Sequence, residues 1–431
     1  MKLVPRTFAG RLAAVAALGL VLRAAYLYGL ARKVVGIGDW WFYHWQAGLI
    51  ANGHGFTDPW LLLGTHHYRA SAMHPPLYPL LLSGLYLIGG HSQLDQRSLG
   101  LLLGTITLVL VGLLGRRVGG DRMGLLSAGL YAVYPVMIAV DGDLMSEVLY
   151  GPLIAGMLLS ALAVIDRPNL RRAALLGALI GLAALTRTEA LLFLPFLVVP
   201  VAWRARSSWR GRAGLAAAAI LTCVVVIGPW LIRNESTFGR FVLISTNDQT
   251  VLAGANCPKT YYGVNMGSWD VTCIAPRTRT NEAAQAAIWQ HQGIDYATHH
   301  LSRLPAVLAI RLARTWDLWQ PRRQARTFAE GQQIGVAEAG VVVFWVFALV
   351  GIAGVVALWR RRRSALLVLL APAVVVCVAT VIGYGVPRLR DSFDVALPVL
   401  VAAGALAVGQ RLATSRRVPK RFAAGSRQPA V

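Results

Sequence analysis

The feature of this sequence that most constrains its fold is a series of apolar segments that recurs along nearly its whole length. Each has close to the ~20 residues that a helix needs to cross the roughly 30 Å hydrocarbon core of a membrane. They lie near 10–31, 98–115, 123–140, 145–165, 173–186, 189–203, 213–232, 337–359, 365–385 and 393–410. The chain is therefore predicted to be an all-α polytopic membrane protein with about ten transmembrane helices. No small-residue cleavage motif follows the first segment, so we expect a retained anchor there and not a signal peptide.

Basic residues gather in the short connections between these segments and at both ends of the chain. The connections are 116–122, 167–172, 204–212 and 360–363, and the ends are 1–11 and 411–431. The only acids in or beside them are Asp121 and Asp166. Because Lys and Arg favour the cytoplasmic side of short loops, both termini are predicted to be cytoplasmic. The formal net charge of +23 thus reflects orientation in the membrane, and no nucleic-acid partner is expected.

One apolar run is too short to fit the series. Residues 77–90, LYPLLLSGLYLIGG, would cross the membrane only if the bilayer thinned locally. A crossing there would also invert every later connection, so we interpret the run as re-entrant or interfacial within one outer loop at 32–97. The transmembrane domain at 1–410 then includes this loop and a small extracytoplasmic segment at 233–336. A basic cytoplasmic tail at 411–431 is expected to be disordered.

The extracytoplasmic segment is expected to contain a disulfide and a surface helix. Cys257 and Cys273 are close in sequence and lie in an oxidising compartment, so a disulfide between them is favoured. The other two cysteines, Cys223 and Cys377, fall in apolar segments. The stretch 308–319, LAIRLARTWDLW, mixes apolar and basic positions and is predicted to lie on the membrane surface.

A lone acid stands directly after the first apolar segment. Asp39 opens the aromatic stretch DWWFYHWQAGLIANGHGF. The carboxylate could act as the N-cap of a juxtamembrane helix, or it could be the chemical centre of the protein. The neighbouring aromatic residues suit either the face of a sugar or the interfacial belt of a membrane protein, and the belt is favoured.

Further ionisable residues recur at the outer ends of the predicted helices. They are His74, Arg97, Asp141, Asp143, Glu147, Arg187, Glu189, Arg388, Arg390, Asp391 and Asp394. Each has a structural alternative, as a helix cap, an ion pair across a hairpin, an anchor for lipid headgroups or a packed histidine. Ionisable groups at a membrane boundary are costly, and their gathering at one face favours a cavity. Carboxylates and arginines in one cavity suit a reaction that needs a base for a hydroxyl and cations for a phosphate.

The order of these motifs resembles a known group of enzymes. Asp39 is followed by HPPLYP at 74–79, an Arg that opens the next apolar segment, DGDLMSE at 141–147, LTRTEALL at 185–192, PWLIRNESTFG at 229–239 and VPRLRDSF at 386–393. Together they resemble the GT-C superfamily of membrane glycosyltransferases. Within it, the chain looks most like the family of dolichyl-phosphate-mannose protein mannosyltransferases and lipid A aminoarabinose transferases. The resemblance covers about residues 1–410 and implies a GT-C-like fold whose first outer loop carries a juxtamembrane helix.

The resemblance also implies roles for individual residues. Asp39 would be the general base, although Trp40 stands where the family often has a second acid. The residues expected near the donor phosphate are His74, Arg97, Arg187, Arg388 and Arg390. The acids expected to line the cavity are Asp143, Glu147 and Glu189. No metal ligand is assigned.

The function implied is transfer of a hexosyl or pentosyl group from a polyprenyl-phosphate donor to an acceptor hydroxyl, with inversion, on the outer face of the plasma membrane. The acceptor could be a protein, a polysaccharide or a lipid, and membrane lipids surround the chain. No resident cofactor is expected, because the lipid-linked sugar is a co-substrate; a need for a divalent metal is left open.

Two rival functions were weighed. A transporter or lipid flippase of the cell envelope would also line a cavity with charges, but it should carry them deep within several spans and show an internal repeat. No clear repeat is present. A non-catalytic envelope-assembly protein would not need so many acids and arginines at one face.

Overall fold

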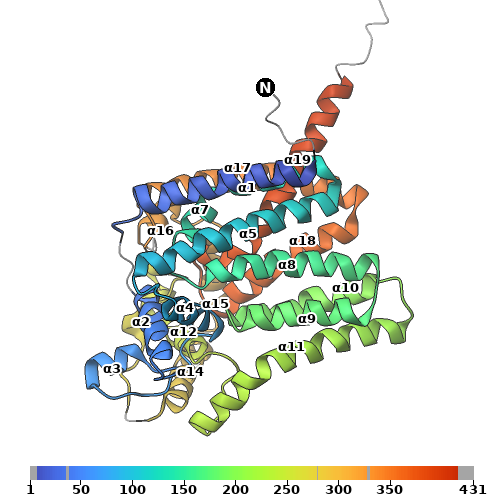
Figure 1. Cartoon of the computed structure of the whole chain (residues 1–431). Helices are drawn as coiled ribbons and strands as arrows, with labels where there is room; N and C mark the ends of the chain where they lie inside the picture. Colours follow the sequence, from blue (N-terminus) through green and yellow to red (C-terminus); the bar gives the residue numbers. More distant parts are fainter. Residues whose placement is uncertain (1–6, 35–37, 279, 328–330, 416–431) are drawn as a thin grey trace, which may run out of the picture.

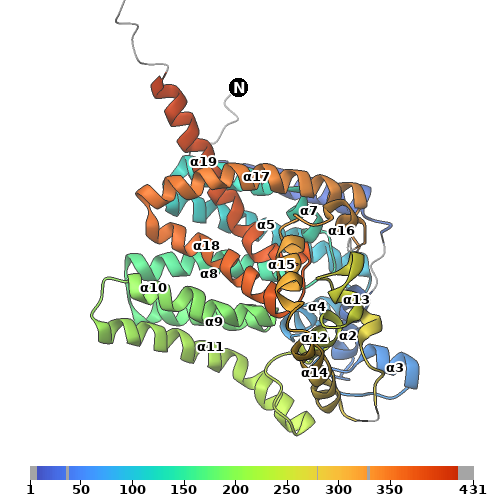
Figure 2. The same ribbon diagram turned by 180° about the vertical axis from the view of Figure 1, so that it is seen from behind.

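The computed structural model describes residues 7–34, 38–278, 280–327 and 331–415, and Figures 1 and 2 show it from opposite sides. Within these residues the chain is built of helices, with no strand beyond an isolated bridge between Thr57 and Ala70. The predicted all-α membrane fold is confirmed.

In the described ranges, seven helices are long and apolar enough to cross a membrane. They are α1 (Phe8–Ala24, continued as a π-helix to Leu30), α5 (Gln93–Gly119), α8 (Glu147–Asp166), α11 (Trp209–Phe238), α17 (Ile334–Arg361), α18 (Arg363–Ile382) and α19 (Asp391–Ser415). An eighth crossing results if α6 (Asp121–Ala132) and α7 (Pro135–Asp141), which meet at a 65° bend, are counted as one span.

The expected count of about ten is not confirmed, and the difference lies at 173–186 and 189–203. The first corresponds to α9 (Leu170–Ala184), whose 15 residues extend for only about 22 Å. The second is a series of short turns that ends in α10 (Val199–Arg204). Pro195 and Pro200 each lack an amide hydrogen and interrupt a regular helix there. Both segments lie between α8 and α11 (Figure 1).

The first outer loop leaves and re-enters the bundle at the same end. Nη1 of Arg97, in the first turns of α5, donates to the carbonyl of Ala31 at 3.1 Å, just after the first span. Between these points lie α2 (Asp39–Ala51), α3 (Pro59–Thr65) and α4 (Leu77–Leu87). Helix α4 has 11 residues and packs on α2, so the apolar run at 77–90 does not cross the membrane.

We expect α5 to place its two ends on opposite sides of the membrane. In intact cells, a membrane-impermeant maleimide should label His91→Cys, whereas Arg122→Cys should react only after permeabilisation. Both positions are exposed and flank this one helix. The native cysteines are in a disulfide or in membrane helices, and the parent protein is the control. Labelling of both sites from one side would mean that α5 does not span.

The segment 233–336, predicted to be extracytoplasmic, gathers at the same end of the bundle as the first loop, and both views agree on this (Figures 1 and 2). It contains α12 (Asn247–Ala255), α13 (Pro258–Tyr261), α14 (Glu282–His299), α15 (Leu304–Thr315) and α16 (Pro321–Thr327). The structure joins Cys257 and Cys273 by a disulfide across this segment.

The stretch 308–319, predicted to lie on the membrane surface, falls mostly in α15, but its basic positions do not face outward as in an interfacial helix. Arg311 and Arg314 on α15 are buried, each with 2% of its surface exposed. Arg311 donates to the carbonyl of Ala255 at 2.7 Å, and Arg314 to that of Met266 at 2.6 Å. Both arginines thus satisfy backbone carbonyls within this segment. The residues that α15 exposes are apolar.

The start of the tail at 411–431, which was expected to be disordered, is helical. Helix α19 continues to Ser415. The rest, from residue 416, lies outside the described residues.

Candidate active site

Five charged side chains meet at the end of the bundle where the two outer segments gather. Asp39, Arg388, Glu147, Arg187 and Glu189 alternate in sign, and each contacts the next by an ion pair. We refer to these five residues as the ion network. They come from the start of α2, a 3₁₀ turn before α19, the start of α8 and the turn after α9. Residues far apart in the sequence therefore build one charged surface.

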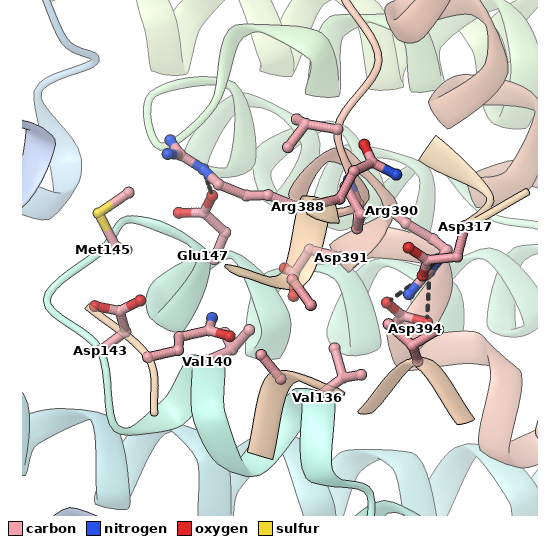
Figure 3. Close-up of a pocket in the computed structure, with 17 residues that line it drawn as sticks. Val136, Val140, Asp143, Met145, Glu147, Asp317, Arg388, Arg390, Asp391 and Asp394 are labelled. Carbon is pink, nitrogen blue, oxygen red and sulfur yellow. Dashed lines mark hydrogen bonds and ion pairs between the residues drawn. The ribbon is translucent and has the colours of Figure 1, made fainter. Parts of the chain in front are cut away.

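Glu147 is the centre of the network. It is the first residue of α8, where the positive end of the helix dipole stabilises a carboxylate. Only 3% of its surface is exposed. Its Oε1 accepts a hydrogen bond from Nη1 of Arg187 and another from Nε of Arg388. Figure 3 shows the contact with Arg388. One buried carboxylate thus holds two guanidinium groups at a fixed spacing.

Arg187 keeps its charge and retains donor capacity. Its Nε donates to Glu189, whereas its Nη2 has no hydrogen-bond partner within the part of the chain that the structure describes. Burial disfavours the charged form, but Glu147 and Glu189 outweigh it and raise the pKa of Arg187 well above its usual value. A permanent cation with an unused donor is a suitable ligand for a phosphate.

Asp39 does not cap its helix. The cap position is Gly38, with φ +71°, and no side chain caps the first turn of α2. Oδ2 of Asp39 instead accepts from Nη2 of Arg388 at 3.0 Å, and its Oδ1 lies 3.5 Å from Nε2 of His74. The carboxylate is 30% exposed, so a substrate can reach it.

The neighbours of Asp39 keep it ionised. Burial opposes ionisation, but the positive charge of His74 and Arg388 outweighs it, and the pKa of Asp39 lies below its usual 3.8. The pKa of His74 is lowered because the ring is buried, so at neutral pH Arg388 is the permanent counter-charge. Nδ1 of His74 lies 3.4 Å from the hydroxyl of Tyr43, which fixes the ring beside Asp39.

Two cavities adjoin the network, and Arg388 lines both. The large cavity has a volume of about 480 Å³, and its charged lining consists of Asp39, His74, Arg187, Glu189, Asp248 and Arg388. The small cavity measures about 100 Å³, and its charged lining consists of Asp143, Glu147, Asp317, Arg388, Arg390, Asp391 and Asp394 (Figure 3).

The structure does not bring every expected phosphate ligand to Asp39. His74, Arg187 and Arg388 line the large cavity. Arg97 lines neither cavity; it is 2% exposed, and its Nε donates to the carbonyl of Gly142 at 2.8 Å. Arg97 thus holds the start of the first loop against the end of α7.

Arg390 and Asp143 belong to the small cavity. Arg390 is 1% exposed and donates to Asp317 at 2.8 Å and to Asp394 at 3.1 Å. Asp143 accepts from the indole nitrogen of Trp40 and from the amide of Leu144. Arg390 is therefore already neutralised by two carboxylates.

Three residues of these cavities were given no role from the sequence. Tyr43 orients His74. Asp248 lies in the first turn of α12, and burial together with Glu189 raises its pKa to about 7. Asp391 directly follows Arg390, in the same motif as Arg388. Within the described residues, no three His, Cys, Asp or Glu side chains form a group that could hold a metal ion, and we assign no metal ligand.

Comparison with known proteins gives a partial family match. Residues 73–232 match a family model described as dolichyl-phosphate-mannose-protein mannosyltransferase. This stretch includes Glu147, Arg187 and Glu189 but neither Asp39 nor Arg388. No curated protein sequence matches the chain.

Solved structures share the fold. The archaeal oligosaccharyltransferase AglB from Archaeoglobus fulgidus, in complex with an inhibitory peptide and a dolichol-phosphate, is 14% identical, with a TM-score of 0.59 over 98% of this chain and 52% of that one. The apo form of the Archaeoglobus fulgidus oligosaccharyltransferase gives 15% identity and a TM-score of 0.59 over 98% and 53%. This chain thus spans about half the length of these proteins.

The structure of ArnT from Cupriavidus metallidurans bound to undecaprenyl phosphate is 15% identical, and the match covers 96% of this chain and 82% of that one with a TM-score of 0.45. The family match and the shared architecture confirm the resemblance drawn from the sequence motifs: the chain is a membrane protein with the fold of the GT-C glycosyltransferases.

Proposed function

We propose that this protein transfers a hexosyl or pentosyl group from a polyprenyl-phosphate donor to an acceptor hydroxyl. The observation that carries the proposal is the contact between Arg388 and Asp39. It places a guanidinium group that can bind a phosphate directly beside a carboxylate that can act as a base. The matched family is described as using dolichyl phosphate mannose, and AglB was solved with a dolichol-phosphate. Both support a polyprenyl-phosphate donor.

The donor phosphate would bind between Arg187 and Arg388. Both line the large cavity, and Glu147 fixes the position of both. Charge-assisted hydrogen bonds from guanidinium groups to phosphate are short and strong. A phosphate held there places the attached sugar near Asp39, since Arg388 contacts that carboxylate.

The reaction would then proceed in one displacement with inversion. Asp39 takes the proton of the acceptor hydroxyl while the oxygen of that hydroxyl forms a bond to the anomeric carbon. The bond from that carbon to the phosphate oxygen breaks, and the polyprenyl phosphate leaves with the electron pair. Arg187 and Arg388 stabilise the negative charge that develops on the leaving group.

Donor binding should make Asp39 a stronger base. In the free protein, Arg388 helps to hold the pKa of Asp39 below 3.8. A phosphate that pairs with Arg388 offsets this charge and adds a second anion, so the pKa rises. A base works best when its pKa approaches the operating pH.

We therefore expect the acid limbs of two pH profiles to differ. Activity requires ionised Asp39, so it is lost as the pH falls through the pKa of that group. The profile of kcat/KM for the donor reports the free protein and that of kcat the donor complex. The acid limb of the kcat profile should therefore lie at higher pH than the limb that Asp39 produces in the kcat/KM profile. Coincident limbs, or the reverse order, would contradict the effect of phosphate on Asp39.

The location on the outer face of a plasma membrane, with both termini cytoplasmic, is part of the proposal. The basic connections between spans support it, because they lie at the end of the bundle opposite the ion network. The alternative, a transporter or lipid flippase, is not favoured, because the ion network lies at the ends of helices and matches the needs of transfer chemistry.

The decisive experiment uses purified full-length protein in liposomes. It is supplied with radiolabelled polyprenyl-phosphate hexoses and pentoses together with envelope protein, polysaccharide and lipid fractions. Incorporation of label into one fraction, with release of polyprenyl phosphate, is the expected result. Movement of the labelled lipid between leaflets without any release of polyprenyl phosphate would support a flippase and overturn the proposal.

A further inference from the structure

A buried carboxylate in the small cavity has no partner. Asp391 is 4% exposed, and neither of its carboxylate oxygens accepts a hydrogen bond from any residue that the structure describes. It lines the small cavity and lies between Glu147 and Asp394 in Figure 3. A buried carboxylate without donors is costly, so such a group calls for a partner that is absent from the chain itself.

The two arginines of this cavity already contact carboxylates. Arg390 neutralises Asp317 and Asp394, and Arg388 contacts Glu147. The five acids of the lining exceed its two arginines, which leaves an excess of negative charge. This cavity repels anions and attracts groups that donate hydrogen bonds.

The shape and remaining lining fit part of a sugar ring. About 100 Å³ is room for several waters, each of which needs roughly 10–15 Å³, or for one small polar group. Val136, Val140 and Val341 add apolar side chains to the lining. Sugars combine an apolar ring face with hydroxyl donors, so both the apolar and the acidic parts of the lining would be used.

We infer that the small cavity is a binding site for a hydroxyl-bearing, non-anionic part of the acceptor, with Asp391 accepting its hydrogen bonds. The inference rests on the proposed function and narrows the acceptor class: a neutral sugar binds and an acidic sugar is excluded. Arg388 lines both cavities. An acceptor bound to Asp391 in the small cavity would therefore lie next to a donor bound beside Asp39 in the large cavity. Asp391 is thus a specificity-determining residue and not a catalytic one.

The test measures binding without turnover. Purified full-length protein is titrated with methyl glucopyranoside, its uronate analogue and its 2-amino analogue, for both the parent and Asp391→Asn. The parent should bind the neutral sugar at least tenfold more tightly than the uronate, and Asp391→Asn should lose most of this preference. The amine is expected to bind the parent at least as well as the neutral sugar, because the cavity is acidic. If only the 2-amino analogue bound, the cavity would be a site for a cationic group and not for hydroxyl groups, and the inference would be overturned.

Two controls make the result specific. Asp295→Asn changes an exposed acid outside both cavities and should leave all three affinities unchanged. If Asp391→Asn does not fold, Asp391→Ser replaces it. Equal sugar binding by parent and variant would mean that Asp391 only occupies the positive end of helix α19, and would overturn the inference.

The outcome is separable from that of the proposed function. Absence of glycosyl transfer with normal, Asp391-dependent sugar binding would sink the transfer proposal alone. Transfer with no dependence on Asp391 would sink this inference alone. Where transfer is measured, Asp391→Asn should raise the KM for a neutral acceptor about tenfold while kcat and the KM for the donor stay near their parent values.

Discussion

Asp39→Asn is expected to lower the rate of glycosyl transfer by about a hundredfold or more, because general-base help is typically worth roughly 10²–10⁴-fold. Asparagine keeps the size and shape of the side chain but cannot take a proton. Helix α2 should be unaffected, since its cap is Gly38. Initial rates with saturating polyprenyl-phosphate sugar measure the effect.

Donor binding separates a base from a positioning group. In Asp39→Asn, Arg388 loses a competing carboxylate, so the KM for the donor should stay the same or fall. Asp295→Asn serves as the matched control, with parent-like values throughout. Near-normal kcat in a folded Asp39→Asn variant would end the case for this residue as the base, and a raised donor KM alone would assign it to binding.

Arg187→Ala and Arg97→Ala are expected to fail in different ways. Removing Arg187 deletes a phosphate ligand from the large cavity and should raise the KM for the donor roughly 10–100-fold, in line with the 1.5–3 kcal/mol of a charged hydrogen bond. Arg97 contacts the carbonyls of Gly142 and Ala31 and no cavity. Its loss should lower the free energy of unfolding by about 1–3 kcal/mol, with the donor KM preserved.

Donor titrations and thermal inactivation of both variants check this pair. If Arg97→Ala raised the donor KM while Arg187→Ala left it unchanged, the assignment of the phosphate site to the large cavity would be wrong.

The helical membrane fold and the order of the loops could be predicted from the sequence, because they depend on the length and spacing of apolar segments. Residues 77–90 contain the 11-residue helix α4, as the shortness of the run predicted. The orientation drawn from the basic connections stays a prediction. The number of spans could not be predicted at 173–203. Apolar composition there is continuous, but the prolines and the turn at Arg187 divide the segment into pieces shorter than the membrane.

For the charged residues of the site, the sequence could predict at which end of the helix bundle they gather, but not which of them contact one another. Helix-end positions were enough to suggest Asp39, Glu147, Arg187 and Arg388 as neighbours. They could not show that Arg97 turns into the packing between the loop and α7, since that depends on which carbonyls lack donors. Asp391 escaped assignment for a related reason.

Nothing in the sequence around Asp391 sets this residue apart. It stands out because no described neighbour donates a hydrogen bond to its carboxylate. A missing hydrogen bond is a property of three-dimensional packing, and no local pattern of residues encodes it. The same holds for Asp248, which reaches the large cavity only because α12 folds over it.

The separation of Asp39 and Arg388 along the chain has a consequence for biosynthesis. These two contacting residues are 349 positions apart, whereas Glu147, Arg187 and Glu189 are close in sequence. At about 5–20 residues per second, a ribosome needs roughly 20–70 s to proceed from one to the other. Glu147, Arg187 and Glu189 can pair early, but the nascent protein joins Asp39 to them only when the turn that carries Arg388, before α19, is made. A ribosome that stalls before this turn therefore releases a polypeptide with most of its spans and an unfinished active centre.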